Sequence, residues 1–152
     1  MEAPEEVEEV QPFQETSATR VVLRMLNHLI PFLGSKERGV RYRSAQFVAL
    51  VLSNSLANFP TDYNKVSRRI FKQVHTGLTM RVHDKEAIVR VQAVIGLARL
   101  LEMGVNLAGD DEDEDSEGEQ SGTVELLIEV MQNDTSAYVS DSSLVHFLTM
   151  GI

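Results

Sequence analysis

An arginine on the apolar side of a helix is the feature that most restricts how this chain folds. The segment HDKEAIVRVQAVIGLARLL, residues 83–101, is apolar almost all the way round, yet it contains Arg90. At about 100° per residue, Val94 and Leu97 flank Arg90, whereas the polar Arg99 lies on the far side. A buried guanidinium is strongly destabilising unless a carboxylate meets it. The sequence therefore predicts an acidic partner close to Arg90 in the fold.

The same pattern occurs earlier in the chain. In RGVRYRSAQFVALVLSNSLANF, residues 38–59, Arg41 is surrounded on the helix wheel by apolar residues such as Val48 and Leu52. The two Val-Arg pairs are 49 residues apart, at Arg41 and Arg90. A repeating pair of helices is therefore the expected unit of the fold.

A third copy begins with TVELLIEVMQNDTSAYVS, in which Asp134 falls 50 residues after Asp84 and Ser140 replaces the arginine. Asp84 precedes Arg90 by six residues, in a turn, so its carboxylate is expected to pair with Arg90 and to accept backbone hydrogen bonds at the next helix start. In a stack, Asp134 or Ser35 of a neighbouring unit is the alternative partner. We interpret the group as a structural ion pair that holds the repeats in register: Asp84, Arg90 and Arg41.

Four helices are expected before residue 105. The first has Thr16 or Ser17 as N-cap and stops at Gly34, and the third begins at Thr61 or Asp62. The apolar side of the third helix is expected to carry Tyr63, Val66, Ile70, Val74 and Leu78.

The segments around these helices differ in composition. Acid-rich, low-complexity stretches bury too little apolar surface to fold. The expected organisation is a disordered acidic arm over 1–16, helix pairs over 17–105, a disordered acidic loop over 106–122, the start of a third repeat over 123–139, and an off-pattern tail over 140–152.

The acidic loop has three interpretations. It is a solubilising insertion, it screens basic residues by competing with their ligand, or it recruits a basic partner such as histones. Ser116 begins the stretch SEGE, which suits an acidophilic kinase and makes Ser116 a candidate phosphorylation site.

The charge is strongly uneven along the chain. All 14 Lys and Arg lie between Arg20 and Arg99, where four acids oppose them, so this part carries a net charge of +10 although the whole chain carries −9. Clustered basic charge is typical of a protein with a polyanionic partner. The absence of cysteine excludes disulfides and thiolate chemistry, and no signal peptide or membrane-spanning run is expected.

The expected third helix carries a stripe of cations with no acid between Asp62 and Asp84. We interpret this stripe as a surface for the duplex DNA backbone, and four phosphate contacts predict a log-log salt slope of about −3.6. The alternative is a solvated charged face. The stripe and the residues that extend it are Lys65, Arg68, Arg69, Lys72, Arg38, Arg43, Arg81 and Lys85.

Enzymatic chemistry is not expected. The four histidines lack metal-ligand spacing, and no Gly-rich phosphate loop or nucleophile elbow occurs. His83 beside Asp84 has the spacing of a base and its orienting acid, but a turn between repeats explains the pair better. We expect no metal, no cofactor, no small-molecule substrate and no membrane contact.

Two motifs extend beyond a generic helix repeat: Val-Arg-x-Arg-x-x-Gln at residues 40–46, and Asp-Lys-x-x-x-Val-Arg-x-Gln-Ala-Val-x-x-Leu-x-Arg-Leu at residues 84–100. Through them the chain resembles the N-terminal part of the condensin subunit 3 family, the HEAT-repeat G subunits. The resemblance implies an all-α fold, an α-α superhelix of HEAT or ARM type with two full helix pairs plus part of a third. It also implies a non-enzymatic subunit acting in mitotic chromosome condensation, in the nucleus and on the chromosome, with duplex DNA, a kleisin subunit and the other condensin subunits as partners.

The resemblance ends after NDTSAYV, where the family continues with arginines and this chain reads SDSSLVHFLTMGI. A truncated chain is therefore expected, for which kleisin binding by later repeats is not implied. The competing interpretation is a HEAT scaffold that grips helical or extended peptides without contacting DNA. A salt-sensitive DNA shift distinguishes the two.

Overall fold

The computed structural model describes residues 16–55, 65–105, 116–134 and 136, without the side chains of 55, 65 and 116–121. Over these residues the secondary structure is entirely helical. The helices are α1 (Ser17–Leu33), α2 (Arg38–Ser55), α3 (Lys65–Arg81), α4 (Ala87–Glu102) and α5 (Ser116–Asn133).

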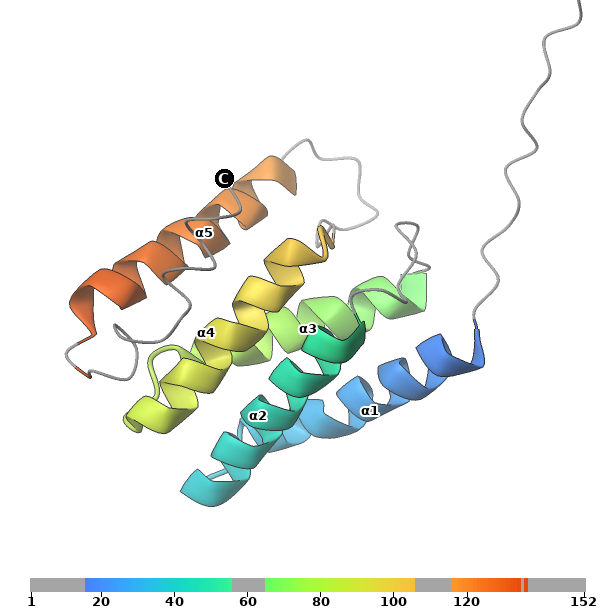
Figure 1. Ribbon diagram of the computed structural model, residues 1–152, viewed down its shortest axis with the longest axis horizontal. Coiled ribbons are helices and arrows are strands. Elements are labelled where there is room, and N and C mark those ends of the chain that lie inside the picture. Colours follow the sequence, from blue (N-terminus) through green and yellow to red (C-terminus); the bar gives the residue numbers. More distant parts are fainter. Residues whose placement is uncertain (1–15, 56–64, 106–115, 135, 137–152) are drawn as a thin grey trace, which may run out of the picture.

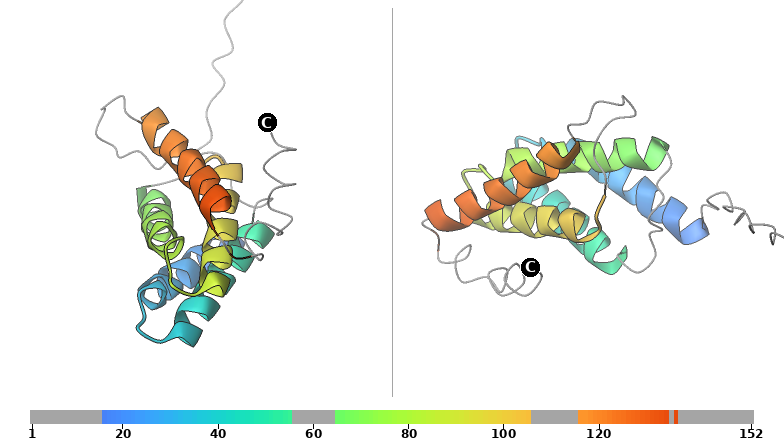
Figure 2. Two further views of the ribbon diagram at one scale, coloured as in Figure 1. Left: turned by 90° about the vertical axis from the view of Figure 1, so that its left-hand side faces the viewer. Right: turned by 90° about the horizontal axis from the view of Figure 1, so that it is seen from above.

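The helices pack as pairs in two layers (Figures 1 and 2). α1 packs against α2 and α3 against α4, while α2 runs beside α4 and α1 beside α3. One layer therefore contains α1 and α3, and the other contains α2 and α4. α5 lies alongside α4 as the first helix of a third pair. The expected all-α, HEAT-like arrangement of two full helix pairs plus part of a third is confirmed.

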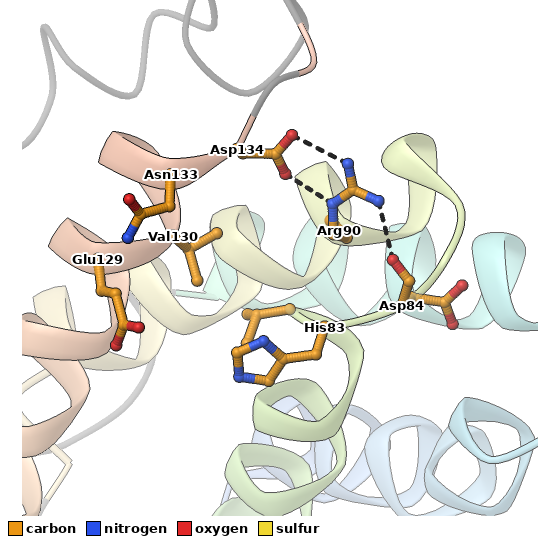
Figure 3. A pocket seen from close by; sticks show the side chains of 8 residues that line it. His83, Asp84, Arg90, Glu129, Val130, Asn133 and Asp134 are labelled. Carbon is orange, nitrogen blue, oxygen red and sulfur yellow. Dashed lines mark hydrogen bonds and ion pairs between the residues drawn. The ribbon is translucent and has the colours of Figure 1, made fainter.

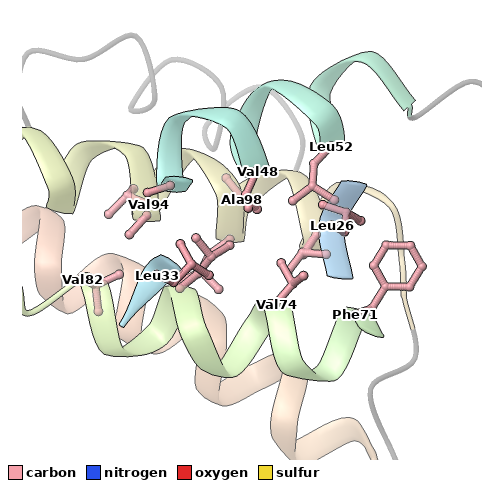
Figure 4. Close-up of a cluster of buried hydrophobic side chains, with 14 of the residues drawn as sticks. Leu26, Leu33, Val48, Leu52, Phe71, Val74, Val82, Val94 and Ala98 are labelled. Atoms are coloured by element: carbon pink, nitrogen blue, oxygen red, sulfur yellow. The ribbon is translucent and has the colours of Figure 1, made fainter. Parts of the chain in front are cut away.

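The core lies between the two layers (Figure 4). Leu26 and Leu33 of α1 meet Val48 and Leu52 of α2, and α3 and α4 add Phe71 and further aliphatic side chains, all in one buried cluster. These residues recur at three- and four-residue spacing, so each helix buries one continuous stripe. Burying such a stripe, rather than intrinsic helix propensity, provides most of the stability of each helix.

The buried side of α3 differs from the sequence expectation. Val66 was expected on the apolar side, but it is 64% exposed, whereas Phe71 is fully buried. The buried stripe of α3 is centred on Phe71, Val74 and Leu78, and Val66 lies about 80° or more from each of them on the helix wheel. Val66 instead lines a groove of about 340 Å³ between α1 and α3.

Two helix starts bear on the expected boundaries. Thr16 is the N-cap of α1, where its Oγ1 accepts a hydrogen bond of 3.2 Å from the Thr19 N–H. α5 begins at Ser116, so the helix starts within the range 106–122 that the sequence analysis gives to the acidic loop. Leu127 further along α5 is buried in the core. The remaining expectations for residues 1–15, 61–63, 106–115 and 137–152 lie outside the described residues.

Candidate nucleic-acid interface and the ion pairs that order it

Asp84 is the centre of a buried ion cluster in the turn between α3 and α4. Arg41 of α2 donates from Nε to Oδ2 at 2.7 Å and from Nη2 to Oδ1 at 3.1 Å. Arg81 donates to Oδ2 at 3.0 Å, and the Glu86 N–H donates to Oδ1 at 3.1 Å. Only 6% of the Arg41 side chain and 2% of the Asp84 side chain are exposed. The carboxylate is thus fully used by four donors within the protein.

The third nitrogen of Arg41 joins this cluster to the preceding turn. Nη1 donates to the carbonyl oxygens of Ser35 at 3.1 Å and Lys36 at 2.8 Å. One guanidinium therefore connects the turn between α1 and α2 to the turn between α3 and α4. A planar five-donor group is suited to this role, because it binds a carboxylate with two parallel bonds and still has a donor to spare.

Arg90 repeats the same geometry one unit further along (Figure 3). It donates from Nε and Nη2 to the Asp134 carboxylate at 2.6 and 2.9 Å, and from Nη1 to the Asp84 carbonyl oxygen at 2.9 Å. The Ser136 N–H donates to Asp134 Oδ1 at 2.8 Å, as Glu86 does to Asp84. We call these two linked sites, Arg41 with Asp84 and Arg90 with Asp134, the ion-pair ladder.

The first-choice pairing from the sequence, Asp84 with Arg90, is wrong at the level of side chains. Arg90 contacts only the backbone oxygen of Asp84, and its two-pronged bond goes to Asp134, which had been the alternative. Arg90 lies within α4, and its guanidinium connects the turn before α4, through the Asp84 carbonyl oxygen, to the end of α5, through the Asp134 carboxylate. Ser35 occupies the corresponding place in the first turn, where its Oγ accepts the Glu37 N–H at 3.2 Å.

The ladder shifts the pKa of both carboxyl groups downward. Burial raises the pKa of Asp84, but hydrogen bonds from Arg41 and the Glu86 N–H, with the charges of Arg41 and Arg81, lower it further than burial raises it. For Asp134, the hydrogen bonds from Arg90 are the largest effect and hold its pKa well below the usual range of a carboxyl group. Both groups are therefore carboxylates at neutral pH.

The exposed cations separate onto opposite layers. On α3, Arg69 and Lys72 are exposed and Arg68 is half-buried, while the side chain of Lys65 is among those not described. On α1, Arg20 and Arg24 are exposed, although the sequence analysis had not selected them. We call the outer surface of this layer the basic face: Arg20, Arg24, Arg68, Arg69 and Lys72.

Contacts across the basic face connect its two helices. Asn27, one turn after Arg24, lines the same groove as Arg69, so the cations of α1 and α3 share one surface. Neither helix contains an Asp or Glu. Over residues 16–55, 65–105, 116–134 and 136, Arg24, Arg69 and Lys72 take part in no ion pair. This half of the surface was missed from the sequence, and the signal that could have found it is the absence of Asp and Glu from α1.

The other candidates lie elsewhere. Arg38 and Arg43 belong to α2, in the opposite layer, and Lys85 lies in the turn before α4. Arg38 is 3.7 Å from Glu86, and Arg43 lies over the Tyr42 ring. Arg81 is largely buried and paired with Asp84, so we leave it out of the proposed DNA-contacting group. These residues do not extend the stripe on α3, since α2 and α3 face away from each other.

Comparison of the sequence with curated proteins identifies its relatives. The chain is 31% identical over 127 residues, or 83% of its length, to condensin complex subunit 3 of Schizosaccharomyces pombe. The chain is a homologue of condensin complex subunit 3. The chain is also 25% identical to the condensin complex subunit 3 of Saccharomyces cerevisiae over 137 residues, or 89% of its length. It is 32% identical to the condensin complex subunit 3 of Xenopus laevis over 76 residues, or 50% of its length.

The match to condensin subunit 3 covers a small part of each relative. The chain spans 12% of the length of both yeast proteins and 7% of the Xenopus protein. No protein-family profile matches the chain, and no solved structure matches it. The resemblance to condensin subunit 3 inferred from the Val-Arg motifs is confirmed.

The remaining candidate sites are a phosphorylation site and a polar pocket. Ser116, the candidate phosphorylation site, is the first residue of α5, and its side chain lies outside the description. A polar pocket of about 320 Å³ beside the ladder is lined by His83, Glu129 and Asn133 (Figure 3). In the described ranges, no three His, Asp or Glu side chains gather as metal ligands, and no helix is long and apolar enough to cross a bilayer.

The ladder predicts a definite dependence of stability on pH. Because the pKa of Asp84 and of Asp134 is lower in the folded chain than the ordinary value of an aspartate in an unfolded chain, ionised carboxylates stabilise the fold. This contribution is complete above about pH 5 and is lost as pH falls below about 4. We expect the urea midpoint, measured by far-UV circular dichroism, to be constant from pH 6 to 8 and to fall between pH 4 and 2. The Asp134→Asn variant should show a shallower fall, and an equally steep one would contradict the assignment.

Proposed function

We propose that this chain is a non-enzymatic HEAT-repeat segment of a condensin-type complex that holds duplex DNA by its phosphate backbone. The basic face of α1 and α3 is the proposed contact surface. The observation that carries the proposal is that exposed cations of two helices from two repeats occur together on one layer, with no acidic residue in either helix.

The proposed contact is electrostatic and independent of base sequence. Lysine and arginine side chains neutralise phosphates and release condensed counterions, which supplies affinity without base reading. The residues that define the basic face are all cations, and the exposed His28–Phe32 pair lies further along α1, so we propose backbone contacts rather than stacking of unpaired bases. Duplex DNA therefore suits the basic face better than a single strand does.

The relatives support the biological setting of this proposal. All three are named condensin complex subunit 3, so we assign the chain a role in chromosome condensation, in the nucleus and on mitotic chromosomes. The other condensin subunits, including a kleisin, are the proposed protein partners. Neither cofactor nor small-molecule substrate enters this function.

A salt titration tests the DNA contact. The basic face offers between three and five phosphate contacts, which correspond to a log-log slope between about −2.7 and −4.5. With a fluorescent duplex, we expect the anisotropy-derived dissociation constant to rise about 40-fold or more from 50 to 200 mM salt, equally for unrelated duplex sequences. A slope near zero, or a strong preference for one sequence, would reject backbone neutralisation.

A second candidate function, gripping a peptide, is favoured by the other layer. Phe47 and Leu50 of α2 are about half exposed, and Ile88 of α4 is also exposed, so this face is apolar as well as basic. Binding of an amphipathic peptide together with a DNA slope near zero would favour this scaffold function over the first.

A further inference from the structure

The edge of α1 that faces away from α3 is apolar and uncovered. Asn27 and Leu33 approach α3, since Asn27 shares a groove with Arg69 and Leu33 lies against Gly77. On the opposite side of the helix, Val21, Met25 and Phe32 are 55%, 47% and 41% exposed. Figure 1 shows α1 at the outer end of the array, with its neighbours on one side only.

An apolar edge at the end of a helix-repeat array needs a cover. Solenoids normally end in repeats with polar outer faces, because the repeat at the end has no neighbour to bury its apolar side. Three large apolar side chains on one edge depart from that rule. The edge, defined by Val21, Met25 and Phe32, is called the free edge below.

We propose that residues 1–15 of this same chain dock antiparallel along the free edge and screen the adjacent cations. This segment has apolar residues at three-residue spacing, Val7, Val10 and Phe13, between six glutamates and no lysine or arginine. Its apolar residues match the free edge. Its glutamates match Arg20 and Arg24, which are exposed on the neighbouring side of α1.

The dimensions of the two partners agree. From Val21 to Phe32 the helix rises about 16 Å at 1.5 Å per residue. The six residues from Phe13 back to Val7 span about 19 Å in a polyproline II conformation, whose three residues per turn place Val7, Val10 and Phe13 on one side. Because residue 15 immediately precedes the N-cap Thr16, the segment is held at an effective concentration on the order of millimolar beside the edge. Weak contacts are therefore sufficient for occupancy.

Docking of this segment would regulate the basic face. Glutamates held beside Arg20 and Arg24 occupy the place of phosphates, so DNA must displace them to use the α1 half of the face. This part of the inference rests on the proposed DNA function. The docking itself does not, and the two are tested separately.

Spin labelling of the full chain tests the docking without DNA. The sequence contains no cysteine, so Ala3→Cys gives one labelled site. We expect strong paramagnetic broadening of the amides of His28 to Phe32 at low salt, a distance along α1 that an undocked segment does not favour. Replacing Val7, Val10 and Phe13 by serine, which keeps every charge, should abolish it.

The docking would be overturned if broadening were confined to the first turn of α1, or if it affected the α2 and α4 face instead. It would also be overturned if, in a mixture of spin-labelled and unlabelled chains, only the amides of the unlabelled chains were broadened. That result would mean that the segment covers the edge of a second copy. The free edge can also pair directly with a second copy, and a dimer by light scattering that persists in the serine variant would count against the proposal as well.

Regulation is then measured by DNA affinity. At 50 mM salt we expect the serine variant to bind duplex DNA three- to tenfold more tightly than the unmodified chain, with a steeper salt slope. Broadening at His28 to Phe32 with unchanged DNA affinity would overturn the screening but not the docking. Loss of DNA binding in both chains would reject the proposed function and leave the docking intact.

Discussion

Asp84→Asn is expected to lower the free energy of unfolding by about 3–5 kcal/mol, the usual cost of breaking a buried ion pair on one side. Asparagine keeps the size of the side chain and one acceptor for the Glu86 N–H. It removes the negative charge that both Arg41 and Arg81 contact at hydrogen-bond distance. Because a small domain has only about 5–15 kcal/mol of stability, this loss removes between about a fifth and all of it, and the thermal midpoint should fall strongly.

Urea and thermal unfolding followed by circular dichroism measure this effect. Glu86→Gln is the matched control, because Glu86 lies two residues after Asp84 and its carboxylate is 3.7 Å from the guanidinium of the exposed Arg38. Losing this contact should change the free energy of unfolding by less than about 0.5 kcal/mol. A double-mutant cycle with Arg41→Gln isolates the coupling between the two partners. If Asp84→Asn unfolds like Glu86→Gln, the buried cluster does not hold the repeats together.

Reversing the charge of Arg24, Arg69 and Lys72 to glutamate is expected to weaken duplex DNA binding about 1,000-fold at 50 mM salt. Three lost phosphate contacts correspond to a salt-slope change of about 2.7, and the new carboxylates add repulsion. All three side chains are exposed, so helix content and the unfolding midpoint should stay close to those of the unmodified chain. Fluorescence anisotropy with a labelled duplex measures the loss.

The matched control places the same charge change on the other side of the molecule. Glutamate at Arg38, Arg43 and Lys85 alters the net charge equally but leaves α1 and α3 intact. We expect less than a tenfold loss of affinity from long-range repulsion alone. Equal losses in the two triple variants would show that net charge, rather than the basic face, governs binding.

The helices themselves were predictable because their signals are local. Spacing of apolar residues located the buried sides of α2 and α4 around Arg41 and Arg90, and Thr16 was recognisable as a cap. On α3 the same reasoning placed Val66 on the wrong side. Periodicity gives the width of an apolar arc but not its centre, which is set by the neighbouring helices.

The site was predictable in its chemistry but not in its pairings. An arginine on a buried face requires a carboxylate, and this requirement is contained in the sequence alone. Which carboxylate satisfies it depends on packing, because Arg41 and Asp84 are 43 residues apart and Arg90 and Asp134 are 44 apart. Asp84, six residues before Arg90 in the preceding turn, was therefore the wrong choice of side-chain partner.

Residue patterns alone were enough to establish that this chain forms paired helices, that their arginines need buried acids, and that it is related to condensin subunit 3. The packing of the helices was needed to show that each arginine binds the turn of the next repeat. It also decided that Arg38 and Arg43 lie on a different layer from Arg69 and Lys72. The reason is that helical periodicity fixes directions around one axis, whereas the relation between two axes arises from the packing of their side chains.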